Sequence, residues 1–169
     1  MASLGHVAVG LAAGRAAGTE RPAAAMVGLA ALSLLPDADV IGFTLGIPYA
    51  STFGHRGASH AILVGLVLGV ACAFLVREPR ARWRLGLFAT LSIVSHGLLD
   101  AMTTGGEGVA LLWPLTSDRY FFAWRPIPVA PIGAGMLSAR GARVLATEAL
   151  YFAPLLAYAL WPRRKKDPA

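Results

Sequence analysis

Apolar residues gather in five segments that are separated by polar, proline-rich or glycine-rich stretches. Alanine and leucine dominate these segments, and β-branched residues do not alternate along them, which is typical of helices rather than strands. We therefore predict a single all-α domain over residues 1–169, a multi-helix integral membrane protein with about four to five apolar helices. The segments lie at about residues 4–18, 22–36, 59–76, 84–103 and 143–161.

Segment length decides which helices can cross a membrane. About 20 apolar residues span the hydrocarbon core, and only the last three segments approach that length. The first two are expected to be half-buried helices that lean on the others. Pro36 is expected to end the second helix, so that Asp37 and Asp39 point into the loop that follows. The N-terminal MASLGH lacks the positive stretch of a signal peptide, so residues 1–18 are expected to belong to the mature fold.

Composition supports the membrane prediction. The chain is 56% hydrophobic and 14% charged, and its mean hydropathy is positive. A soluble domain usually carries about a quarter of charged residues, so a small, very apolar soluble domain is the minor alternative. The one cysteine, Cys72, lies in an apolar run and is expected to be a packing residue, since it cannot form an intrachain disulfide.

Charge is distributed unevenly along the chain. The net charge is +6, but the basic runs REPRARWR (77–84) and RRKK (163–166) flank apolar segments, which favours membrane boundaries over nucleic-acid binding. If the five segments alternate in direction, these runs share one face with Arg15 and Arg21. That face then holds 10 of the 15 Lys and Arg residues and is predicted to be cytoplasmic.

Unusual polar residues gather at the opposite, extracytoplasmic ends of the same segments. They include all four histidines and four of the nine acids of the chain. Within this set, His96 and Asp100 are four residues apart and share a helix face, and Gly57 can bend the backbone between His55 and His60. The full set is His6, Asp37, Asp39, His55, His60, His96, Asp100 and Glu148.

Imidazole and carboxylate together form the ligand set of zinc, and also of iron or manganese. Ionisable groups in or near a membrane are costly and are functional by default. The set is large enough for about two metal ions, which can together hold the attacking and leaving oxygens of a displacement. The predicted metal ligands are His6, Asp37, His55, His60, His96 and Asp100, and the predicted catalytic residues are Asp37, Asp39, Arg56 and Glu148.

Each residue also has a simpler interpretation. His6 can be an interfacial histidine, Asp37 a turn residue, and Arg56 an interface anchor. The pair His96 and Asp100 can be a buried hydrogen-bonded pair, and Glu148 can pair with a nearby arginine. The joint pattern favours a metal site over all of these together.

Five motifs in order resemble the YdjM-like family of inner-membrane metal-dependent hydrolases. They are GH at 5–6, LLPDAD at 34–39, HRGASH at 55–60, SHGLLDAMTTGG at 95–106 and LLWPL at 111–115. The resemblance implies an all-helical fold similar to zinc-dependent phospholipase C, in which His96 and Asp100 match an HxxxD element and Glu148 an acid on a late helix. That fold has companion histidines which this chain lacks, so two ions are expected rather than three.

Taken together, these observations predict a multi-pass inner-membrane hydrolase that depends on a divalent metal, most readily Zn. It is expected to cleave a phosphoester or a lipid-linked phosphate at the membrane surface, with no nucleic-acid partner. Arg56 is expected to steady an anionic oxygen of the substrate. The alternatives are a non-enzymatic membrane metal-binding or metal-transport protein, and a site that only ties helices together.

Overall fold

The computed structural model describes residues 3–162, and these contain helices and no strand, as the all-α prediction requires. Three 3₁₀ segments accompany the α-helices: η1 (Leu35–Leu45), η2 (Ala58–His60) and η3 (Gly133–Leu137). The α-helices are α1 (Ser3–Ala16), α2 (Pro22–Leu34), α3 (Ile62–Leu75), α4 (Pro79–Ala101) and α5 (Ala139–Leu160).

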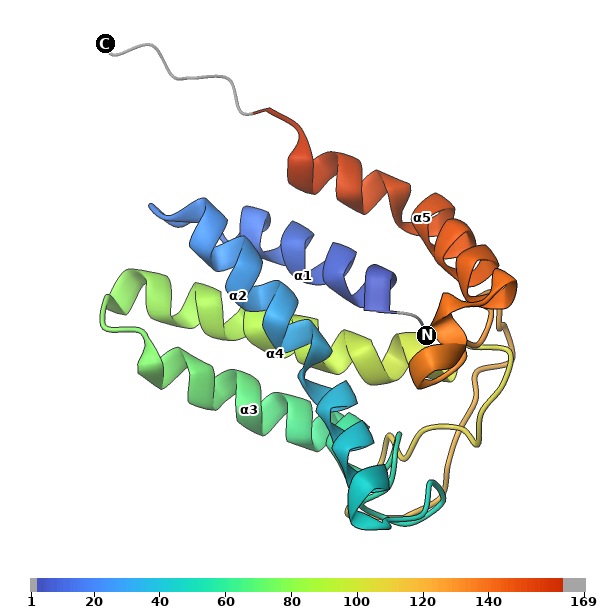
Figure 1. Cartoon of the computed structure of the whole chain (residues 1–169). Coiled ribbons are helices and arrows are strands. Elements are labelled where there is room, and N and C mark those ends of the chain that lie inside the picture. Colours follow the sequence, from blue (N-terminus) through green and yellow to red (C-terminus); the bar gives the residue numbers. More distant parts are fainter. Residues whose placement is uncertain (1–2, 163–169) are drawn as a thin grey trace, which may run out of the picture.

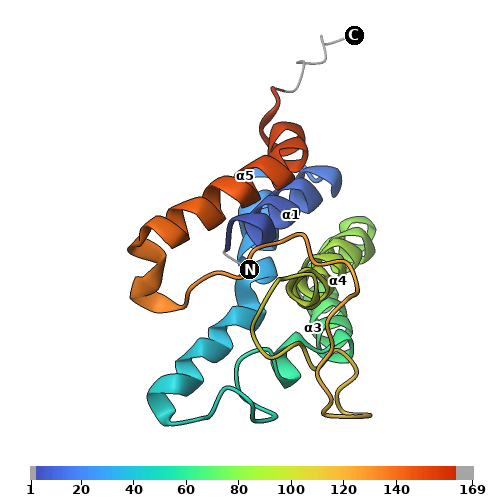
Figure 2. The same cartoon turned by 90° about the vertical axis from the view of Figure 1, so that its right-hand side faces the viewer.

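Helix α4 lies at the centre of the bundle (Figure 1). It packs against α1, α2 and α3, and α5 packs on the outer side of α1. Helices α2 and α3 do not pack against each other, although both pack on α4. The long connection from α4 to α5 crosses the end of α4 before η3 and α5 begin (Figure 2).

Small residues let two helix pairs approach closely. A Cβ atom added to Gly14 on α1 would lie 2.3 Å from the Cα of Met26 on α2. A Cβ on Gly69 of α3 would lie 2.5 Å from the Cα of Thr90 on α4. Backbones that approach this closely are a known means of helix association in membranes, where apolar side chains gain little by leaving lipid.

Helix directions alternate, so each end of the bundle holds the first turns of some helices and the last turns of others. The first turns of α1, α3 and α5 and the last turns of α2 and α4 lie at one end (Figure 1). At the other end, the Arg15 side chain donates a hydrogen bond to the Ala159 carbonyl, which ties the last turns of α1 and α5 together. Arg21 and the basic run 77–84 also lie there, whereas the run 163–166 lies outside the described residues.

Two helices of the described chain are long and apolar enough to cross a membrane, fewer than the four to five apolar helices suggested. They are Pro22–Leu45, in which α2 and η1 are continuous, and Ala139–Leu160. Helix α3 has only 14 residues because Ala61 is extended, so the prediction that 59–76 forms one span-length helix was wrong. Helix α4 has 23 residues, but its first turns carry the arginine run.

The prediction that Pro36 ends the second helix holds for the α-helix, which ends at Leu34, but the loop expected after it was wrong. Leu35 keeps helical dihedral angles, and Pro36 occupies the first turn of η1, where its missing N–H costs no hydrogen bond. The chain therefore continues as a 3₁₀ helix to Leu45, and Asp37 and Asp39 project from this helix rather than from a loop.

Candidate metal centre

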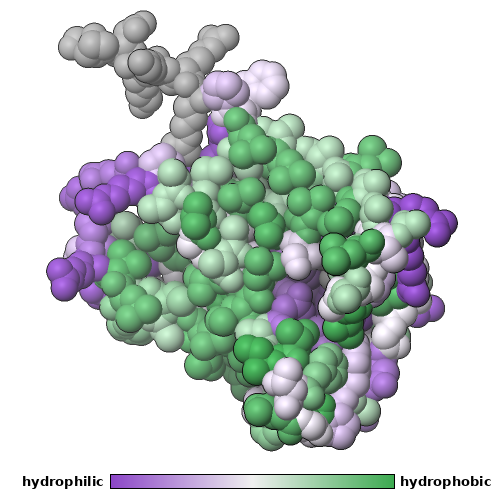
Figure 3. Space-filling view, in the orientation of Figure 1, coloured by the Kyte–Doolittle hydropathy of each residue, from purple (hydrophilic) through white to green (hydrophobic). Residues whose placement is uncertain are grey.

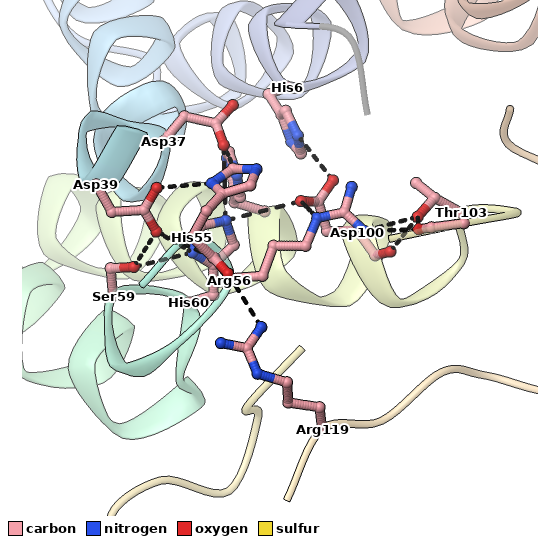
Figure 4. A network of polar contacts seen from close by, with 12 residues as sticks. His6, Asp37, Asp39, His55, Arg56, Ser59, His60, Asp100, Thr103 and Arg119 are labelled. Atoms are coloured by element: carbon pink, nitrogen blue, oxygen red, sulfur yellow. Dashed lines mark hydrogen bonds and ion pairs between the residues drawn. The ribbon is translucent and has the colours of Figure 1, made fainter. Parts of the chain in front are cut away.

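Four predicted ligands meet at the end of the bundle opposite the arginine run. One ligand atom each from Asp37, His60, His96 and Asp100 lies within 4.8 Å of all the others. Figure 4 labels Asp37, His60 and Asp100 in this network. The Oδ1 atom of Asp37 lies 3.2 Å from Nε2 of His96 and 3.6 Å from Nε2 of His60. The Oδ2 atom of Asp100 lies 3.7 Å from Nε2 of His60. We call these four residues the His/Asp cluster.

The imidazole nitrogens in and beside the His/Asp cluster are suited to binding a cation. The Nε2 atoms of His6, His60 and His96 are buried and have no hydrogen-bond partner among the described residues. Buried polar atoms are normally satisfied, so three unsatisfied imidazole nitrogens beside two carboxylates need an explanation. Two nitrogens and two carboxylate oxygens in one group suit a divalent metal such as zinc.

Ser33 fixes the tautomer of His96. The Nδ1 atom of His96 lies 2.7 Å from the Ser33 carbonyl oxygen, which can only accept, so Nδ1 carries the proton. The lone pair of Nε2 then faces the cluster, which is the arrangement of a metal-binding histidine. The Ser33 hydroxyl donates to the His6 carbonyl over 2.8 Å, so this serine ties α1, α2 and α4 together at the site.

Asp39 orients His60 from outside the cluster. Its Oδ2 atom lies 3.2 Å from Nδ1 of His60 and accepts a hydrogen bond from the Ser59 hydroxyl at 2.6 Å. Burial alone would lower the pKa of His60, but the contacts with Asp37 and Asp39 outweigh it, and the pKa lies above its ordinary value. In this position Asp39 resembles a carboxylate that supports a metal-binding histidine.

The same carboxylate also holds His55. Nδ1 of His55 lies 2.7 Å from Oδ1 of Asp39, and the Arg56 N–H donates to Oδ2 over 3.2 Å. Asp39, His55 and His60 form a second group in which one atom of each lies within 4.8 Å of the others. His55, Arg56 and Ser59 donate hydrogen bonds to Asp39, and Nδ1 of His60 hydrogen-bonds to the Ser59 hydroxyl over 3.0 Å, so this second group is held by its own hydrogen bonds and could also hold a metal ion.

Gly97 allows His60 to reach the cluster. A Cβ atom on Gly97 would lie 2.4 Å from the His60 carbonyl oxygen, so η2 can rest on α4 only at this glycine. The position lies one residue after His96, which brings the two histidine rings to a centroid distance of 4.7 Å.

His6 lies beside the cluster. Its ring stacks on the ring of His96, with centroids 3.6 Å apart and planes inclined by 8°. Nε2 of His6 lies 3.6 Å from Oδ1 of Asp100, whereas Oδ2 of the same carboxylate faces His60. Asp100 therefore presents one oxygen to the His/Asp cluster and the other to His6, which places the predicted ligand His6 beside the cluster and outside the four residues that form it.

Arg56 is buried directly behind Asp100. Its Nε lies 3.0 Å from Oδ2 of Asp100, and its Nη1 donates to the Thr103 hydroxyl and the Gly105 carbonyl. Its φ of 64° is in the left-handed region, which is costly for a residue with a Cβ. Strained backbone of this kind is concentrated at functional sites, where surrounding contacts maintain it.

Glu148 lies outside the His/Asp cluster. It is fully buried on α5, and its Oε2 accepts a hydrogen bond of 3.1 Å from the N–H of Gly5, in the first turn of α1. A carboxylate at this position also interacts favourably with the helix dipole. Glu148 therefore holds α1 at the site, one residue before His6.

A cavity of about 570 Å³ opens beside the cluster. Asp37, His55 and Arg56 form its polar side, and Asp37 is the most accessible residue of the cluster, with 26% of its side chain exposed. The opposite wall is apolar and comes from η1, the segment before η3, and η3 itself. It consists of Val40, Phe43, Val129, Ala130, Pro131, Ile132 and Met136.

Sequence reasoning missed the residues that support the predicted ligands. Arg119 donates to the carbonyl oxygens of Tyr49, Ser51 and His55, which fixes the loop before His60. Ser59 lies inside the HRGASH motif and could have been chosen as a polar neighbour of the histidines. Nothing in the local sequence around Arg119 points to this distant loop.

Comparisons with known proteins agree with the membrane prediction. A family model described as YdjM inner membrane protein matches residues 1–165. The inner membrane protein YbcI of Escherichia coli (strain K12) is 40% identical over 144 residues, which cover 79% of this chain and 81% of that protein. No solved structure matches the chain.

Proposed function

The chain belongs to the YdjM family of inner membrane proteins, and on that premise we propose that it is a metal-dependent hydrolase of lipid-linked phosphoesters. The observation that carries the proposal is the convergence of two carboxylates with buried imidazole nitrogens that make no hydrogen bond, beside an open cavity. Ionisable groups at the membrane are retained for function, and this set matches the ligands of a hydrolytic metal site.

The His/Asp cluster supplies the ligands for one divalent ion. Asp37, His60, His96 and Asp100 present two carboxylate oxygens and two imidazole nitrogens. His6 faces the second oxygen of Asp100 and supplies a ligand for a second ion, for a total of about two. When bound, such ions polarise a phosphoryl oxygen and lower the pKa of water.

The pair of Asp39 and His55 is assigned the role of general base. His55 lines the cavity, and its Nδ1 lies 2.7 Å from Asp39. A carboxylate that holds one ring nitrogen orients the other and stabilises the imidazolium that forms when the histidine takes a proton. His55 then accepts the proton of the attacking water, which refines its earlier assignment as a ligand.

Arg56 is assigned the binding of an anionic phosphoryl oxygen. It lines the cavity, and its guanidinium is held in place by Asp100 and Thr103. The apolar wall of the same cavity suits the hydrocarbon part of a substrate. A phosphate at the polar side and an alkyl chain along that wall match a lipid phosphate rather than a water-soluble phosphoester.

The extracytoplasmic side is proposed for the site. The described arginine run lies at the opposite end of the bundle, and positively charged ends of membrane helices favour the cytoplasm. A reporter fused after residue 160 should then be cytoplasmic, and a fusion in the segment 104–132 should be outside. The reverse result would place the site in the cytoplasm and leave the chemistry unchanged.

The hydrolase proposal is tested with purified protein in mixed micelles of lipid phosphomonoesters and phosphodiesters. We expect release of phosphate or headgroup that stops when metal is chelated and returns with Zn or Mn. His55→Gln should keep its metal but lose turnover by about 10²–10⁴-fold, whereas the exposed loop variant Asp118→Asn should be unchanged. Metal-loaded, folded protein that cleaves no lipid phosphate would favour metal transport or a site that only ties helices together.

A further inference from the structure

A second cavity lies at the end of the bundle opposite the His/Asp cluster. It has a volume of about 670 Å³ and lies between the α1–α2 connection and the first turns of α4. Arg21, Arg80 and Arg84 line it together with Glu20 and Glu78. Figure 3 shows hydrophilic residues gathered at this end, beside a broad hydrophobic face.

The charges of this cavity favour an anion. None of its three arginines forms an ion pair with another residue in the range 3–162. Glu78 is already used, since its two carboxylate oxygens accept hydrogen bonds from the backbone N–H groups of Arg80 and Ala81.

A hydroxyl group in the same cavity lacks a partner. Oγ1 of Thr19 is buried and makes no hydrogen bond within the described part of the chain, although Thr19 lines the cavity. Unpartnered buried hydroxyl groups are uncommon, and a ligand oxygen would satisfy this one.

An apolar groove of about 330 Å³ continues from the basic cavity. The two share Ala25 and Leu85 as lining residues. The groove runs between α2 and α3, which do not pack against each other, with α4 as its floor. It is lined by Leu29, Leu32, Leu75, Val76 and other apolar residues, and Gly28 leaves space open above it.

We propose that this composite site binds one anionic phospholipid. The phosphate lies among Arg21, Arg80 and Arg84, where basic residues between membrane helices commonly hold anionic headgroups. One acyl chain lies in the groove between α2 and α3. The shared chemistry is a phosphate anion, and the continuous groove favours a lipid over free phosphate.

This lipid is separate from the substrate. Arg84 and His96 are 12 residues apart on α4, which corresponds to about 18 Å along the helix axis. The proposed lipid therefore lies toward the other end of the bundle from the His/Asp cluster and fills the space between two helices that do not pack against each other. Its role is to hold α2 and α3 in place on α4.

The test uses protein purified in mild detergent and native mass spectrometry. Wild-type protein should retain one phosphatidylglycerol and bind it more tightly than phosphatidylcholine of the same chains. The double variant Arg80→Gln/Arg84→Gln should bind phosphatidylglycerol about 30-fold more weakly. The matched control Arg140→Gln/Arg143→Gln removes the same charge from the exposed start of α5 and should bind as wild type does.

A variant that fills the groove distinguishes binding of a phospholipid from binding of a free anion. Gly28→Phe places a ring in the open space and should weaken phosphatidylglycerol binding without changing the binding of inorganic phosphate. Equal phosphatidylglycerol affinity in wild type and the double arginine variant would overturn the proposal. So would a Gly28→Phe variant that binds the lipid normally, because the anion would then bind without its acyl chain.

Discussion

Replacing Asp39 by asparagine tests whether a residue outside the His/Asp cluster controls its affinity for metal. The carboxylate receives His55 Nδ1 at 2.7 Å, the Ser59 hydroxyl at 2.6 Å and His60 Nδ1 at 3.2 Å. The asparagine amide keeps one oxygen that can accept a hydrogen bond. Its other atom becomes an NH₂ group, which cannot accept from the donors that surround Asp39. The Ser59 hydroxyl, which hydrogen-bonds to Nδ1 of His60 over 3.0 Å, then loses the acceptor that orients it, and the tautomer of His60 is no longer fixed.

The expected loss follows from the role of such supporting residues. Removing a partner that orients a metal-binding histidine typically weakens metal binding by 10–100-fold, which is about 1.4–2.7 kcal/mol. The assay is a competition titration of zinc against a fluorescent chelator in detergent, with helicity checked by circular dichroism. Asp118→Asn, an exposed loop acid, is the control. Unchanged zinc affinity in a folded Asp39→Asn protein would refute the supporting role of Asp39.

Three further changes probe other parts of the account. Gly69→Leu should destabilise the protein by about 1–3 kcal/mol, because even a Cβ atom at position 69 would lie 2.5 Å from the Thr90 Cα. The control Gly28→Ala places its Cβ in open space and should leave the melting temperature equal or higher. His6→Ala should lower the metal content by about one ion per chain while folding is retained, and loss of every ion would contradict a separate role for His6. The raised pKa of His60 stabilises metal-free protein below about pH 6.5, and this contribution is lost as pH rises through the raised pKa. Metal binding requires the neutral ring, so the rise in melting temperature on adding zinc should grow from pH 6 to pH 8. A rise that is the same at every pH would exclude His60 as a ligand.

Sequence reasoning succeeded where the spacing of residues fixes their geometry. The i, i+4 spacing of His96 and Asp100 placed both on one face of α4, and both contribute an atom to the His/Asp cluster. Alternating helix directions brought Asp37 and His60 to the same end of the bundle, although 22 residues of sequence separate them.

It failed where backbone details or distant contacts decide the outcome. The second α-helix ends just before Pro36, but the sequence alone did not show that the chain continues as a 3₁₀ helix in place of a loop, because proline is also compatible with a first helical turn. Glu148 was predicted to be catalytic, which stays a prediction; the sequence did not show that its carboxylate accepts a hydrogen bond from the first turn of α1. The contacts of Ser33 and Arg119 join segments whose approach depends on the whole packing arrangement.

The metal content of purified protein is the direct test of whether the His/Asp cluster is a metal centre. Wild-type protein and His96→Ala should be purified in detergent without chelators, reconstituted with zinc, dialysed, and analysed by inductively coupled plasma mass spectrometry. We expect about two divalent ions per wild-type chain and at least one fewer in the variant. Folded wild-type protein that retains no metal, or a variant that retains as much as wild type, would contradict the assignment of the His/Asp cluster as a metal centre.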